Sequence, residues 1–373
     1  MNCANGAQSA YGTFGTLASN GGMRALRANG ANGGICAHGG IDSNGTICES
    51  ELTGRGVQPT RRAPVRVNPS VPARCFPPHV GLPHRSMSLS SATEGTPDMS
   101  AKIIAVCNQK GGVGKTTLVT GLAEVYTRTL GKKVLVIDAD PQYNVTSAFG
   151  ISNPEFTLND VLYGDEANNQ KILPGVAADA VIPAGEAWQS KPDKKENFPR
   201  LDVIASERNL ASRERDSMMA REHRLRIALK GVADNYDIIL IDCPPSLGLL
   251  TVNALTAATH ALLVTEPRVA SVEGLSEIVT TISEVQENLN EDIELLGVVI
   301  NKTKKNRPDQ QHWIEKVNAN FGDLVFEPMI RDAEVFAKAQ AAALPMRAYG
   351  SEGSEHRADL IQLATLVWKG ANE

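Results

Sequence analysis

The segment 109–117, Gln-Lys-Gly-Gly-Val-Gly-Lys-Thr-Thr, has the composition of a loop that binds phosphate. Its glycines let the backbone curl so that several N–H groups face one anion. Lys115 would contact the β- and γ-phosphates of ATP, and the Thr116 hydroxyl would ligate Mg²⁺. The standard pattern has glycine where Gln109 stands, and Lys110 adds a second cation, so this is a variant phosphate loop. The predicted nucleotide-binding residues are Lys110, Gly111, Gly112, Val113, Gly114, Lys115, Thr116 and Thr117.

Two apolar runs end in aspartates, as a site that hydrolyses nucleotides requires. Val134 to Ile137 is followed by Asp138 and Asp140, and Ile238 to Ile241 is followed by Asp242. A carboxylate near the γ-phosphate orients or deprotonates the attacking water, a role that we assign to Asp140 beside the catalytic lysines Lys110 and Lys115. We assign Asp138 and Asp242, with Thr116, to the magnesium site. The alternative for Asp138 or Asp140 is that the side chain only caps a loop.

Apolar strands alternate with amphipathic helices from Lys102 onward. This alternation predicts an α/β fold with a doubly wound, mostly parallel sheet and helices on both faces, of the P-loop NTPase type. In such a sheet, ligands bind at the carboxyl ends of the strands, where the loop and the aspartates lie. The expected strands are 103–107, 134–138, 201–205, 238–242, 261–265 and 295–301, and the expected helices are 115–130, 209–232, 269–289, 310–321 and 359–368.

Residues 1–98 differ in composition from residues 99–373, which we assign to one ATPase domain. The first segment is rich in Gly, Ala, Ser, Asn, Pro and Arg and has no apolar period, so we predict that it is disordered. It contains eight arginines, five acidic residues and no lysine, a net charge of +3 within a chain of −5. One hypothesis places the translation start at Met99 or Met87; the others are a targeting peptide or a basic tail that holds nucleic acid.

Composition also limits the function classes. No apolar run approaches the 18 or so residues that a membrane-spanning helix needs. The six cysteines lack the paired spacing of a zinc site or a disulfide framework, which favours a cytoplasmic setting. We expect Cys107 and Cys243 to be packing residues.

The motifs at 110–117, 138–142 and 242–246 together resemble the ParA/Soj family of DNA-partition ATPases. The phosphate loop alone also fits division-site ATPases, nitrogenase iron proteins and arsenite pumps, whereas Asp140-Pro-Gln and Asp242-Cys-Pro-Pro-Ser resemble the partition branch. The resemblance implies a homodimer that forms on ATP binding, with Lys110 reaching the partner's ATP. It also implies nonspecific DNA binding, a ParB-like adaptor and a cytoplasmic, nucleoid-associated protein.

The same resemblance assigns further residues. Asn301, after a strand, resembles the family's adenine-side position, with a turn-forming role as the alternative. A basic run resembles a DNA-contacting loop, although such runs are more often solvated. The residues assigned to DNA are Lys302, Lys304, Lys305 and Arg307, with Arg331 and Lys338 as extensions.

The sequence departs from the family's pattern in two respects, and it leaves two rival functions open. The stretch 165–200 is longer than the family's usual link and is interpreted as an inserted loop or a partner surface, and residues 1–98 do not resemble a winged helix. The rivals are a MinD-like ATPase acting on a membrane and an ATPase that positions a protein cargo. The first needs a basic amphipathic C-terminal helix, but 359–368 has few cations and is expected to pack on the core, so no membrane partner is expected.

Overall fold

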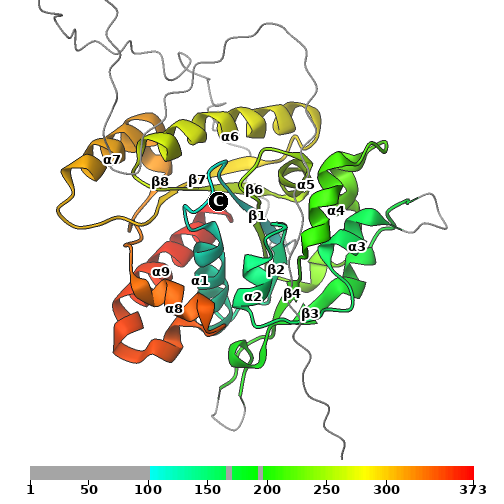
Figure 1. Cartoon of the computed structure of the whole chain (residues 1–373), viewed down its shortest axis with the longest axis horizontal. Helices are drawn as coiled ribbons and strands as arrows, with labels where there is room; N and C mark the ends of the chain where they lie inside the picture. Colours follow the sequence, from blue (N-terminus) through cyan, green and yellow to red (C-terminus); the bar gives the residue numbers. More distant parts are fainter. Residues whose placement is uncertain (1–100, 165–169, 192–195) are drawn as a thin grey trace, which may run out of the picture. The chain divides into compact units, whose positions relative to one another are not determined.

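The sheet at the centre of the fold has eight strands. The computed structural model describes residues 101–164, 170–191 and 196–373, so the expectations for residues 1–98 lie outside the described residues. The strand order is β3-β4-β2-β5-β1-β6-β7-β8, and every neighbouring pair is parallel except β3 and β4 (Figure 1). The strands are β1 (Lys102–Cys107), β2 (Val134–Asp138), β3 (Val181–Pro183), β4 (Leu201–Ile204), β5 (Ile238–Asp242), β6 (His260–Thr265), β7 (Glu294–Ile300) and β8 (Val325–Phe326).

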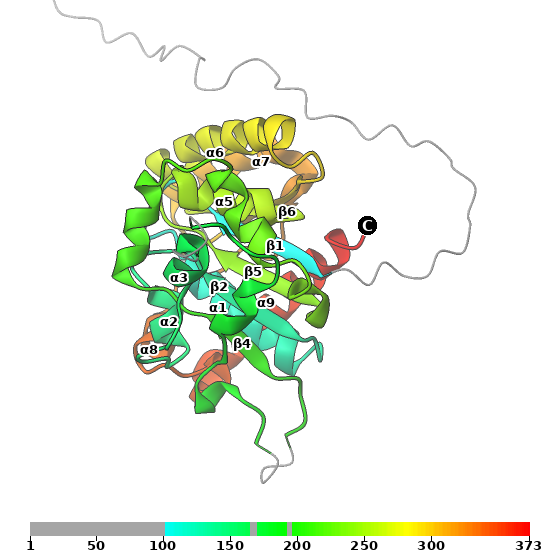
Figure 2. The same cartoon turned by 90° about the vertical axis from the view of Figure 1, so that its right-hand side faces the viewer.

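Helices cover both faces of this sheet, as the sequence predicted. Every residue of β2 and β5 is buried, as expected of parallel strands covered on both sides. Along β1, Ala105 and Cys107 join one apolar cluster with α3 to α7, while Ile104 and Val106 join the other with α1, α2 and α9 (Figures 1 and 2). The helices are α1 (Lys115–Arg128), α2 (Asn144–Ala148), α3 (Leu158–Tyr163), α4 (Arg224–Ala228), α5 (Leu249–Ala257), α6 (Val269–Asn288), α7 (Pro308–Phe321), α8 (Glu334–Ala341) and α9 (Gly350–Gly370).

The last helix, α9, packs against α1. Leu360, Leu363 and Val367 are buried there, and the Tyr126 hydroxyl donates to the Ala364 carbonyl at 3.2 Å. This confirms that the helix over 359–368 packs on the core. Among the helices of the described residues, none is both long enough and apolar enough to cross a bilayer.

The expected helix over 209–232 is wrong as a continuous element. The segment instead contains 3₁₀ turns at Arg208–Arg215 and Arg221–His223 before the short α4. Ala220 has φ of +57°, a left-handed conformation that interrupts a right-handed helix. Nearby, the Arg224 guanidinium donates to the Leu162 carbonyl and forms an ion pair with Asp216, so tertiary contacts replace the helical pattern.

The stretch 165–200 is also more structured than the expected inserted loop. In its described part, Val181–Pro183 forms the antiparallel edge strand β3 on β4. Trp188 is buried against Phe149, and its indole N–H donates to the Ala343 carbonyl at 3.0 Å. Arg347 and Arg128 both form ion pairs with Glu196. The described part of this stretch is therefore part of the folded body rather than an addition to its surface.

We predict that α9 is required for stability. Leu363→Ala should lower the free energy of unfolding by about 2–5 kcal/mol, because it leaves a cavity against α1. Urea denaturation measures this change, and the exposed Gln362→Ala on the same helix should change it by no more than about 0.5 kcal/mol. Equal effects of the two substitutions would contradict the packing of α9 on the core.

Candidate functional site

The predicted site residues meet at the carboxyl ends of three adjacent strands. β5 lies between β2 and β1, and the parallel register places Asp138 directly beside Asp242. The loop after β1 leads into α1, whose first residue is Lys115. The phosphate loop and the aspartates, far apart in the sequence, therefore occupy one edge of the sheet.

The backbone of the phosphate loop has the conformation that its glycines predict. Gly112 and Gly114 have φ of +80° and +89°, and Gly114 is the N-cap of α1. A side chain at Gly114 would collide with the Asn301 amide. Within the described residues, the N–H groups of Val113, Gly114 and Lys115 have no hydrogen-bond acceptor. Unpaired donors at a helix N-terminus form an anion-binding position.

The two lysines of the phosphate loop differ in their burial and in their hydrogen bonds. Lys115 is 6% exposed, and its ammonium donates to the Asn108 carbonyl at 3.4 Å. Lys110 is half-buried, and its backbone N–H donates to the Asn108 side chain at 2.8 Å. The same side chain donates to the Val264 carbonyl at 2.5 Å, so Asn108 connects the start of the loop to β6. The sequence analysis did not identify Asn108, although a polar residue directly after a buried strand is a usable signal.

Thr116 and Asp242 are already in contact. The Thr116 hydroxyl donates to Asp242 Oδ2 at 2.6 Å, and Asp242 Oδ1 is buried without a hydrogen-bond partner. A hydroxyl and a carboxylate are oxygen ligands of the kind that Mg²⁺ takes beside nucleotide phosphates. The donor set therefore fits the predicted magnesium site. The turn that follows Asp242 contacts the loop, since a Cβ on Gly111 would lie 3.6 Å from the Cβ of Pro245.

Asp138 and Asp140 organise the loop after β2. Asp138 Oδ2 accepts from the N–H and the hydroxyl of Thr146, both at 2.8 Å, and its Oδ1 accepts from the Asp140 N–H at 3.2 Å. Asp140 is 7% exposed, and its Oδ1 accepts from the Gln142 N–H at 2.9 Å. Both carboxylates thus bind backbone groups, and their catalytic and metal roles stay predictions. Thr146 was not identified from the sequence, where nothing local links it to Asp138.

The paired carboxyl groups bind protons tightly. Burial, and after it the neighbouring carboxyl of Asp242, raise the pKa of Asp138 to about 8, against the opposing hydrogen bonds from Thr146 and the Asp140 N–H. Burial likewise raises the pKa of Asp242 to about 7, against the Thr116 hydroxyl and the charge of Lys115. Burial raises the pKa of Cys107 to about 12, and Cys243 is also fully buried, in agreement with packing roles for both.

The loop after β7 contacts the phosphate loop. Asn301 is 4% exposed, and its amide donates to the Val113 carbonyl at 2.9 Å. The Lys302 ammonium donates to the Gly112 carbonyl and lies 3.3 Å from Glu266. Asn301 thus contacts the phosphate loop, and its adenine contact stays a prediction. Lys302 lies against the phosphate loop, apart from the other residues assigned to DNA.

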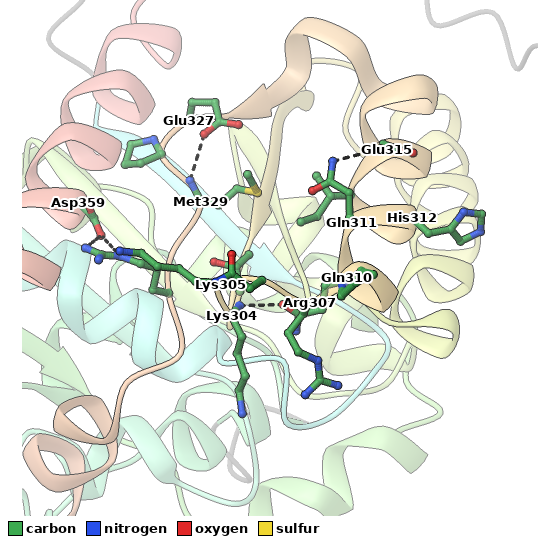
Figure 3. A pocket seen from close by; sticks show the side chains of 16 residues that line it. Lys304, Lys305, Arg307, Gln310, Gln311, His312, Glu315, Glu327, Met329 and Asp359 are labelled. Atoms are coloured by element: carbon green, nitrogen blue, oxygen red, sulfur yellow. Dashed lines mark hydrogen bonds and ion pairs between the residues drawn. The ribbon is translucent and has the colours of Figure 1, made fainter.

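Four of the other basic residues, Lys304, Lys305, Arg307 and Arg331, border an open groove of about 950 Å³ between the start of α7 and residues 327–331 (Figure 3). Most are paired with carboxylates: Lys304 with Asp332 at 3.1 Å, Arg307 with Asp309 at 2.9 Å, Arg331 with Asp359 at 2.8 Å and with Glu355, and Lys338 with Glu352 at 2.7 Å. Lys305 lines the groove and has no ion-pair partner within the described residues. The structure therefore brings Lys304, Lys305, Arg307 and Arg331 together with their charge largely neutralised, whereas Lys338 does not line the groove.

One further carboxylate lies behind the site. Glu214 accepts a hydrogen bond at 2.6 Å from the N–H of Leu249, the first residue of α5. It comes from the segment wrongly expected to be helical, and it binds the helix that follows the Asp242 turn. No local pattern in the sequence links these two segments.

Comparison with known proteins gives consistent results. Residues 101–295 match the AAA domain family. The sporulation initiation inhibitor protein Soj of Bacillus subtilis is 36% identical over 267 residues, which cover 70% of this chain and 97% of that protein. The chromosome partitioning protein ParA of Caulobacter vibrioides is 35% identical over 235 residues, 61% of this chain and 80% of that protein.

Among solved structures, one similar chain is the cobyrinic acid a,c-diamide synthase of Mycobacterium smegmatis with bound ADP and magnesium. It has a TM-score of 0.55 and 26% identity and covers 71% of this chain and 93% of its own.

The raised pKa values predict a pH dependence of stability. Because the folded protein holds these two protons above the ordinary carboxyl pKa of 3.8, the free energy of unfolding should fall as the pH rises from about 4 to about 8. Asp138→Asn should flatten this slope in urea denaturation without magnesium, whereas the exposed Asp179→Asn should keep it. A wild-type slope in Asp138→Asn would contradict the assignment.

Proposed function

Because the chain belongs to the ParA/Soj family of chromosome-partitioning ATPases, we propose that it hydrolyses ATP with Mg²⁺ and uses the cycle to partition DNA. In this proposal the ATP-bound chain dimerises, binds DNA without sequence preference and is released after slow hydrolysis. A ParB-like adaptor on the cargo DNA accelerates that hydrolysis. The protein then acts on the nucleoid. The observation that carries the proposal is the contact of Thr116 with Asp242 directly beside a phosphate loop with free N–H groups.

The proposal assigns a role to each residue of the site. Lys115 and the N–H groups at the start of α1 bind the phosphates of ATP, and Lys110 extends to the ATP of the partner subunit. Thr116 and Asp242 hold Mg²⁺, with Asp138 in its surroundings; the bound ion neutralises charge that develops on the phosphates. Asp140 orients the attacking water. The ADP and magnesium named with the Mycobacterium smegmatis synthase support this choice of ligands.

The basic residues around the groove suit a DNA backbone despite their carboxylate partners. Lys304 and Arg307 have side-chain exposures of 50% and 54%, and exposed ion pairs of this kind are weak because water screens them. Exchanging a carboxylate for a DNA phosphate therefore costs little. Lys305, which has no ion-pair partner among the described residues, has no carboxylate to exchange for a DNA phosphate. We assign Lys304, Lys305, Arg307 and Arg331 to this surface, with Lys338 as an extension of it. Such a surface would bind any sequence, and its affinity for DNA would fall with salt.

We predict that Asp140→Asn abolishes turnover while ATP still binds. The asparagine keeps the carbonyl oxygen that accepts from the Gln142 N–H, but it cannot take up a proton or attract water as a carboxylate does. Phosphate release should fall by roughly 100-fold or more, and ATP affinity by calorimetry should change little. The exposed Asp234→Asn is the control. Wild-type turnover in Asp140→Asn would exclude its catalytic role.

We also predict that DNA binding depends on ATP and on the basic surface. The full chain should bind random-sequence duplex with ATP but not with ADP, and the affinity should fall as salt rises, with a log-log slope that loses about 0.9 for each phosphate contact removed. Lys304→Ala/Lys305→Ala/Arg307→Ala should weaken binding and reduce the slope. Arg226→Ala/Lys230→Ala/Lys369→Ala removes the same charge elsewhere and should retain both.

Absence of DNA binding in every nucleotide state would exclude the partition proposal. Lipid vesicles would then test the membrane alternative. Equal losses from the two triple variants would show that only total charge matters and would exclude the assigned surface.

A further inference from the structure

Asn301 and Lys302 contact two consecutive peptide groups of the phosphate loop. The Asn301 amide binds the Val113 carbonyl, and the Lys302 ammonium binds the Gly112 carbonyl. Lys302 has φ of +55°, a conformation that residues with a Cβ seldom adopt. The chain thus turns sharply after β7 at the residue whose side chain reaches the loop.

A buried carboxylate holds the Lys302 ammonium in this position. Glu266 follows β6 and is 7% exposed; its Oε1 lies 3.3 Å from Lys302 Nζ, and its Oε2 lies 3.1 Å from Arg268 Nε. A charge pair with one buried partner keeps a fixed geometry better than two exposed side chains do. The Lys302 side chain is also less exposed than the Lys304 side chain, at 38% against 50%.

The planarity of the peptide group connects these contacts to the nucleotide side of the loop. Within the described residues the only cis peptide bond is Glu327-Pro328, so the two peptide groups of Gly112-Val113 and Val113-Gly114 are trans. In a trans peptide the N–H points opposite to the C=O. Fixing the Gly112 and Val113 carbonyls on one side therefore directs the Val113 and Gly114 N–H groups to the other. These are two of the N–H groups that have no acceptor among the described residues.

We propose that Lys302 is a positioning residue for nucleotide binding and not a DNA contact. Held by Glu266, its ammonium fixes the Gly112 carbonyl and so orients the Val113 N–H toward a phosphate of ATP. Asn301 does the same for the next peptide group. This inference rests on the proposed binding of ATP by the loop, and it separates Lys302 from Lys304, Lys305 and Arg307, with which the sequence grouped it.

Calorimetric titration of the full chain with ATP and Mg²⁺ tests the proposal. Lys302→Met should weaken ATP binding roughly tenfold, because a hydrogen bond from a charged donor is lost. Glu266→Gln should weaken it in the same direction, and the double variant should lose less than the sum of the single effects, because the two residues act as one unit. Lys302→Arg should retain most of the affinity, and the exposed Lys230→Met should equal the wild type.

Two further measurements distinguish a positioning role of Lys302 from a general loss of structure in the variant and from direct contact with DNA. Lys302→Met should raise KM for ATP while kcat changes little, because Asp140 and Lys110 are unaltered. At saturating ATP, the salt slope of DNA binding should match the wild type in Lys302→Met. In Lys305→Met it should fall by about 0.9.

Wild-type ATP affinity in Lys302→Met, or a salt slope lowered as in Lys305→Met, would overturn the inference. Additive effects of Lys302→Met and Glu266→Gln would overturn the role of the pair. Should Lys302→Met not fold, the inference is still tested by Glu266→Gln, which should weaken ATP binding, and by Lys302→Arg, which should retain it. A wild-type chain that binds no ATP would instead overturn the proposed function itself, and this outcome is recognised in the first titration.

Discussion

The parallel pairing of β5 with both β2 and β1 is the constraint on which the site depends. Because adjacent parallel strands end at the same edge, the register that aligns Asp138 with Asp242 also brings the loop after β1 beside them. Burial on both faces leaves these strands no alternative register without exposing apolar side chains. The two carboxyl groups therefore lie side by side in a dry environment, which raises their pKa values.

The sequence was sufficient for the elements whose pattern is local. The bounds of β2 and β5 agree with the expected runs, since each is a short apolar segment that ends in an aspartate. The glycines of the phosphate loop were interpretable for the same reason, because their positive φ values satisfy a local requirement. The resemblance to the ParA/Soj family rested on such local motifs, and the comparisons confirm it.

What the sequence could not supply are contacts between distant segments. The helix expected over 209–232 is replaced by tertiary contacts such as that of Arg224 with Leu162. These two residues are too far apart in the sequence for a local pattern to link them. The basic run after β7 looked uniform in sequence, yet Lys302 binds Glu266 while Lys304 binds Asp332. Basic residues of the same run in the sequence thus have different surroundings, because their ion-pair partners come from different elements.

The contact of α9 with α1 has a consequence for how the chain is made. Tyr126 and Ala364, which bind each other across this contact, are 238 positions apart. At a synthesis rate of about 5–20 residues per second, α1 waits roughly 12 to 48 seconds for the helix that covers it. The helix that begins at Lys115 in the phosphate loop therefore gains this apolar cover only after the residues between Tyr126 and Ala364 have been synthesised. Until then the nascent chain exposes an apolar surface of the kind that chaperones recognise.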